Sequence, residues 1–178
     1  MYSNMLTKYM AESIQAAKVV VITFGFIEQF YSIVRNKLLF YNQHPYYYGL
    51  HLSKDALKST ELMLRDYFMT LHDINSLILS LRKITSAPIV FSVSPVPLER
   101  TFRKKSNIYE ANVRSKSTLL LATRDAVESH ENTFYFPSYE IVTSFGSRGF
   151  DSKDLRHVRQ EVVDQVINLF LQAANFNQ

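Results

Sequence analysis

Residues 18–25, KVVVITFG, are the stretch that decides the fold of this chain. Val and Ile dominate it until the glycine, which is typical of a strand buried on both faces of a parallel sheet. Two more strand-like runs follow at residues 89–93 (IVFSV) and 133–136 (TFYF), and a proline comes soon after each. The segments between them carry apolar residues three and four positions apart, which predicts helices.

The order of these elements predicts the fold class. Strands that alternate with helices favour a mainly parallel sheet covered on both faces, which is a three-layer α/β/α sandwich. The chain begins with a helix, so the first strand of an ordinary α/β domain is missing. Residues 30–52 are expected to be irregular, and a loop carrying Gly146 and Gly149 is expected after the third strand. The expected helices end near Ala17, run from an N-cap at Ser53 to about Thr85, cover residues 108–129, and begin near Asp151 or Ser152.

Length and composition set the broad class. The 178 residues are expected to form a single domain, 1–178. A formal net charge of +4 is mild, and the basic cluster at residues 100–105 lacks a nucleic-acid-reading motif, so we expect a solvated surface and no nucleic-acid partner. No apolar run approaches the roughly 18 residues of a membrane span. The first residues do not resemble an export signal, so the prediction is a cytoplasmic protein.

Several kinds of chemistry are disfavoured. The chain has no Cys, which excludes disulfides, thiolate nucleophiles and thiolate metal ligands. No two of the five His lie four residues apart, and no cluster matches a metal motif, so we expect neither a metal nor a cofactor.

The most suggestive motif is Asp-Leu-Arg-His at residues 154–157. On a helix, Asp154 and His157 would share a face, so that the carboxylate could orient the imidazole as a general base. Two plainer interpretations remain: His157 is a surface residue, or Asp154 only complements the helix dipole. A nucleophile is not found, because Gly-x-Ser-x-Gly is absent and Ser94 lies in a turn shaped by two prolines.

Other candidate residues follow the predicted strands. Ligands of open α/β sheets bind beyond the carboxyl ends of the strands, which meet at one rim. Close packing at a glycine, or pairing of a carboxylate with Lys or Arg, would explain some of these residues equally well. The candidates for the oxyanion and substrate rim are Thr23, Gly25, Glu28, Ser94 and Glu140.

Several segments together resemble one family. They are residues 20–28 (a "TLG…E" strand end), 92–102 ("SPVPL…TF"), 112–116 ("AN…SK"), 135–140 ("YFPSYE") and 154–157 ("DxxH"). In this order they resemble the GSCFA-domain family, a branch of the SGNH/GDSL-like esterase superfamily, over about residues 18–170. The resemblance implies an SGNH-like sandwich with a Ser–His–Asp site for ester hydrolysis or acyl transfer on an acylated small molecule or carbohydrate. It makes His157 the general base, Asp154 its acidic partner, and the segment around Gly25 a neighbour of the oxyanion site.

The chain departs from the family in two places. The name-giving Gly-Ser-Cys-Phe-Ala stretch is missing, and Ile27 stands where the superfamily has an oxyanion Asn. We therefore expect a match to the back two-thirds of the domain, a nucleophile that is unknown, and an isolated chain that is weakly active or inactive. The expected partner is a missing N-terminal segment or a second copy. The alternative function is a non-catalytic binding or scaffold protein that uses exposed aromatics, namely Phe26, Phe30 and Tyr46–Tyr48.

Overall fold

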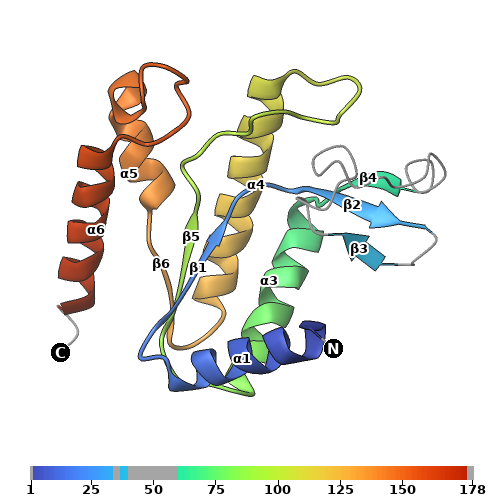
Figure 1. Ribbon diagram of the computed structural model, residues 1–178, viewed down its shortest axis with the longest axis vertical. Coiled ribbons are helices and arrows are strands. Elements are labelled where there is room, and N and C mark those ends of the chain that lie inside the picture. The colour runs from blue at the N-terminus through green and yellow to red at the C-terminus, as the bar shows by residue number, and fades with distance from the viewer. Residues whose placement is uncertain (1, 34–36, 40–59, 176–178) are drawn as a thin grey trace.

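The computed structural model describes residues 2–33, 37–39 and 60–175, and Figure 1 shows the arrangement of its elements. A parallel sheet consists of β1 (Val20–Phe24), β5 (Ile89–Val93) and β6 (Thr133–Tyr135), in the order β1-β5-β6. Val21, Val90 and Phe134 lie in one row across it. The three strands expected from the sequence are thus confirmed, and they are parallel as predicted.

Helices lie on both sides of these strands. Figure 1 shows α3 (Tyr67–Arg82) and α4 (Ile108–Glu128) on one side, with α5 (Ser138–Ser144) and α6 (Gln160–Asn175) on the other. α1 (Tyr2–Ala16) precedes β1. The main core joins the sheet to α3 and α4; it contains Val20, Ile74, Ile78, Leu81, Ile89, Phe91, Ala122 and Ala126. On the other side, the Phe136 ring contacts Phe170 of α6 edge-to-face.

A second, antiparallel sheet was not predicted. It comprises β2 (Glu28–Ser32), β3 (Lys37–Leu39) and β4 (Thr60–Leu64), in the order β3-β2-β4. The expectation of irregular structure over residues 30–52 is therefore wrong for β2 and β3. The single helix expected from Ser53 to Thr85 is wrong for β4, while Ser53 and Tyr46–Tyr48 lie outside the described residues. The Leu and Met residues of β4 suit a helix locally, and pairing with β2 overrides that preference.

Three boundaries also differ from the predictions. α3 begins after Asp66, whose carboxylate accepts a hydrogen bond from Met69 N at 2.8 Å and so caps the helix. The loop expected after β6 contains α5 and a 3₁₀ turn, η2 (Gly146–Gly149). α6 begins at Gln160, not near Asp151 or Ser152. The Asp154–His157 segment is consequently a loop before the helix.

Candidate functional site

Asp154 and His157 meet through loop geometry and not through a helical turn. The Asp154 carboxylate accepts hydrogen bonds from the backbone N–H groups of Arg156 (2.9 Å) and His157 (3.1 Å). Leu155, which lies between Asp154 and Arg156, has a φ of 52°, in the left-handed region that Leu rarely adopts. The loop closes at its base, where Phe150 forms a β-bridge with Val158. The expectation of a helix here is wrong. The Asp154 side chain binds two backbone amides that, inside a helix, would bond to preceding backbone carbonyls.

The side chains of the pair are also hydrogen-bonded, His157 Nδ1 to Asp154 Oδ2. The Arg156 amide, the His157 ring and the His157 amide together lower the pKa of Asp154 to about 2. An ionised carboxylate can only accept, so Nδ1 carries a proton, and in the neutral form of the ring Nε2 has the lone pair. The His157 side chain is 72% exposed. This arrangement presents a proton acceptor to solvent, as a general base requires.

Arg156 joins this loop to the segment that follows β5. Its Nε donates to Pro97 O at 3.4 Å, and its guanidinium forms an ion pair with Glu99 at 3.6 Å. A cavity of about 250 Å³ lies at this junction. It is lined by Phe26, Ser94, Val96, Pro97, Leu98, Glu99 and Arg156. The predicted rim thus contains a hollow next to the Asp154–His157 loop.

The predicted rim residues lie in different surroundings. Thr23 is exposed on β1, and the Gly25 carbonyl accepts a hydrogen bond from Lys116 at 2.8 Å. Ser94 lines the 250 Å³ cavity, while its Oγ accepts from Val96 N at 3.2 Å, in the turn role that its prolines suggest. Gly25 and Ser94 therefore belong to neighbouring loops at the same end of the sheet.

The two candidate carboxylates have structural partners. Glu28 is 1% exposed and accepts from Thr101 Oγ1 at 2.5 Å and Phe102 N at 3.2 Å. Glu140 accepts from the Tyr135 hydroxyl at 2.9 and 3.0 Å, and burial together with this carboxylate raises the pKa of Tyr135. Neither carboxylate is brought to His157. Pairing of Glu140 with a tyrosine replaces the pairing with Lys or Arg that the sequence left open.

Lys116 is a site residue that was not among the predicted candidates. It lies on α4, is 1% exposed, and donates from Nζ to Gly25 O (2.8 Å) and Val96 O (2.9 Å). Burial lowers the pKa of Lys116 to about 8. The sequence offered only an indirect signal, the likeness of residues 112–116 to a family helix, because a buried Lys looks like a surface Lys in a single sequence.

No candidate nucleophile adjoins His157 in the described part of the chain. No serine or threonine hydroxyl there hydrogen-bonds to His157. The hydroxyl of Ser92 bonds to Phe136 O at 2.8 Å, and that of Ser138 bonds to Val93 O at 3.0 Å. Ser115 is buried within α4. The nucleophile therefore remains unassigned.

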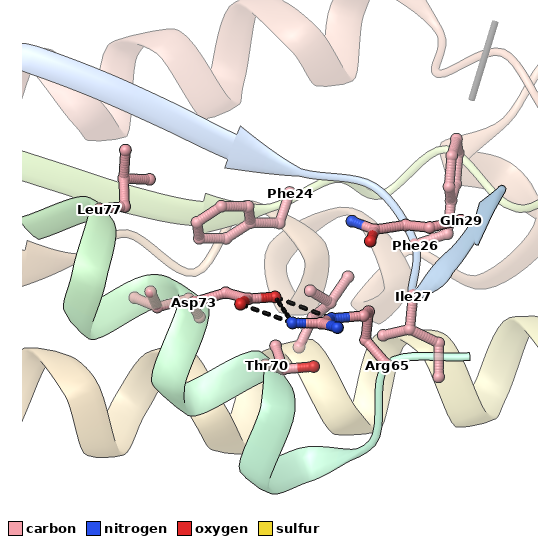
Figure 2. Close-up of a pocket in the computed structure, with 10 residues that line it drawn as sticks. Phe24, Phe26, Ile27, Gln29, Arg65, Thr70, Asp73 and Leu77 are labelled. Atoms are coloured by element: carbon pink, nitrogen blue, oxygen red, sulfur yellow. Dashed lines mark hydrogen bonds and ion pairs between the residues drawn. The ribbon is translucent and has the colours of Figure 1, made fainter. Parts of the chain in front are cut away.

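A second cavity, of about 140 Å³, lies on the α3 side of the rim. Figure 2 shows the Arg65 guanidinium directed at the Asp73 carboxylate within it, beside Phe24 and Gln29. Phe26 lines both cavities. The other aromatic proposed for an exposed surface, Phe30, is 3% exposed and packs on Phe102, which corrects that expectation.

Among the residues that the structure describes, no three His, Asp or Glu side chains gather as metal ligands. None of the helices placed there is both long and apolar enough to cross a bilayer.

The model of the GSCFA family matches residues 2–170, which is most of the chain. No curated protein and no solved structure matched.

Proposed function

The chain belongs to the GSCFA family, and from this membership and the Asp154–His157 contact we propose that it carries the acid–base pair of a serine esterase or acyltransferase. The observation that carries the proposal is the hydrogen bond from His157 Nδ1 to a carboxylate whose pKa is lowered to about 2. The proposed substrate is an O-acyl ester of a small molecule or a carbohydrate. The proposed fold is an SGNH-like α/β/α sandwich whose core is the β1-β5-β6 sheet.

In the proposed reaction, His157 Nε2 accepts the hydroxyl proton while the serine oxygen attacks the ester carbonyl. The imidazolium then returns that proton to the departing alcohol, which leaves an acyl-enzyme. Water or an acceptor alcohol releases the acyl group by the same two proton transfers in reverse order. Asp154 remains ionised throughout and stabilises the imidazolium. The serine is assigned to no residue of this chain.

The test is turnover of p-nitrophenyl acetate by the chain and three variants. We expect slow hydrolysis, because loss of a serine nucleophile costs about a million-fold in such enzymes. His157→Ala should lower this residual rate by on the order of a hundredfold, which is a typical general-base contribution. Asp154→Asn should lower it as well, since an amide no longer holds the charged ring. His72→Ala, which changes an exposed His on α3, is the matched control and should have no effect.

Two outcomes would contradict these expectations. Equal rates in the chain and in His157→Ala would refute the proposed role of the pair. Fast turnover that is lost in His157→Ala would instead reveal a serine nucleophile within the chain.

One observation favours the alternative, a non-catalytic protein that associates with a second copy. Among the described residues, β1 pairs with β5 alone, so its other edge lies open. Its sequence Val-Val-Ile-Thr-Phe has no charge to prevent pairing, and Val21 is 52% exposed. Val21→Lys should then convert a dimer to a monomer in light scattering, while Val113→Lys on exposed α4 surface should not. A monomer at high concentration would exclude this alternative.

A further inference from the structure

Lys116 and Asn112 stand one helical turn apart on α4, and both bind the segment that follows β5. Lys116 Nζ donates to Val96 O at 2.9 Å, and Asn112 Oδ1 accepts from Leu98 N at 3.0 Å. Residues four apart share a face of a helix, so one face of α4 holds this segment at two points. The segment between these two points includes Pro97, whose carbonyl receives the Arg156 side chain.

Lys116 also holds a second segment. The same Nζ donates to Gly25 O at 2.8 Å, in the connection between β1 and β2. Phe26, the next residue, lines the 250 Å³ cavity together with Val96 and Arg156. One ammonium group therefore binds two loops that both contribute residues to the cavity wall.

The charge of Lys116 has no ionic partner among the residues placed in the structure. Every carboxylate pair found there involves another cation, and both acceptors of Lys116 are neutral carbonyls. Burial of an ammonium group without a counter-ion costs free energy. If this side chain contributed packing alone, Met or Leu would suit the position better. Unlike Met or Leu, the ammonium group forms charge-assisted hydrogen bonds to the two carbonyls.

We propose that Lys116 is a positioning residue, which sets the distance between the Gly25 loop and the Val96 loop and thereby shapes the cavity beside the Asp154–His157 loop. This inference rests on the proposed function only for its catalytic consequence; the positioning itself concerns the loops. Substrate in this cavity would contact loops that Lys116 holds through their carbonyls, and Arg156 would transmit the position of these loops to the one that carries His157.

The first experiment uses the unaltered chain and does not depend on catalysis. Burial lowers the pKa of Lys116 to about 8, and no neighbouring charge contributes to this change. Loss of the proton weakens both carbonyl contacts, because neutral amines form weaker hydrogen bonds than ammonium groups. In an NMR titration from pH 6 to 10, the amide signals of Phe26, Leu98 and Arg156 should move with the midpoint of the Lys116 side chain. If the signals of these amides do not change as Lys116 titrates, the proposal is wrong.

The second experiment compares variants by two readouts. In Lys116→Met, the transition near pH 8 should vanish from the rim amides, and the residual p-nitrophenyl acetate turnover should fall about tenfold or more through misplacement. Lys116→Arg retains a charged donor and should recover part of that turnover. Lys105→Met removes an exposed Lys and serves as the control, with both readouts unchanged.

The outcomes separate the two proposals. If no variant, including His157→Ala, alters turnover, the proposed function fails while the NMR titration still decides the role of Lys116. If Lys116→Met leaves the rim amides and their pH response as in the original chain, the positioning role fails whatever the activity. If Lys116→Met does not fold, the titration of the unaltered chain alone decides whether Lys116 positions the loops.

Discussion

The Arg65 guanidinium binds the Asp73 carboxylate through two nitrogens, Nε at 2.8 Å and Nη2 at 2.5 to 2.6 Å. This pair connects the residue that follows β4 to α3, and the Arg65 side chain is mostly buried. It is the strongest ionic contact between the second sheet and the helical layer in the part of the chain that the structure describes, by distance and by number of bonds.

Asp73→Asn should destabilise the chain by about 1–3 kcal/mol, because the guanidinium keeps its burial and loses its charged partner. The measurement is urea unfolding monitored by circular dichroism. Glu128→Gln breaks the exposed Arg124–Glu128 pair and should cost less than about 0.5 kcal/mol. Equal effects of the two substitutions would mean that the Arg65–Asp73 contact contributes no more than a surface pair.

Lys116 should make stability rise with pH in an unusual range. Its pKa is about 8 in the folded chain and near 10.5 when unfolded, so between these values the unfolded chain binds more protons. The free energy of unfolding then increases with pH, by up to about 3 kcal/mol for this one group. Denaturant unfolding at pH 7, 8, 9 and 10 should show this increase in the original chain relative to Lys116→Met. Parallel pH curves for the two proteins would exclude it.

Asp154 should also make stability rise with pH, but in the acid range. Its pKa is lowered from 3.8 to about 2 by the amide of Arg156 and by the ring and amide of His157. The contribution of the carboxylate is complete above its unfolded pKa and is lost as pH falls through about 2. A ¹³C titration of the side-chain carboxyl should give that midpoint, whereas an ordinary value would mean that the loop does not hold the carboxylate.

Gly149 should not tolerate a side chain. A Cβ placed there would lie 2.8 Å from the backbone carbonyl of Val142 and 3.2 Å from Phe145 Cβ, so the contact between α5 and η2 would have to open. Gly149→Ala should therefore cost on the order of 1–3 kcal/mol in thermal or urea unfolding, as overpacking usually does. At Gly25 the corresponding space is empty, so Gly25→Ala should be nearly neutral. A neutral Gly149→Ala would show that η2 moves freely.

The parallel sheet could be predicted because its strands carry the strongest local signal in the chain. Val20 to Phe24 and Ile89 to Val93 are apolar runs typical of buried strands, although Val21 and Thr23 of β1 are exposed. The second sheet gave no such signal. Glu28 is a charged residue that becomes buried only through Thr101 and Phe102, which lie far along the chain, and β4 reads locally as helix.

The contact between Asp154 and His157 was expected from the sequence, but the structure forms it in a different way. Asp154 and His157 are in contact, yet the contact depends on an Asp side chain that caps two backbone amides and on a left-handed Leu155. The helical periodicity of the sequence predicts neither feature. Lys116 escaped prediction because its environment is made by the loops after β1 and β5, which come together only in the folded chain. Catalytic roles for Asp154 and His157 stay predictions.

The two residues between Asp154 and His157 have different tasks. Leu155 supplies the turn through which the amides of the next two residues reach the Asp154 carboxylate, and Arg156 extends its side chain to Pro97. The four-residue stretch therefore carries the catalytic candidates at its two ends. Its inner residues form the turn and bind the neighbouring loop. A related chain that kept the Asp and the His but exchanged the Arg for an apolar residue would retain the pair and lose what ties it to the rim.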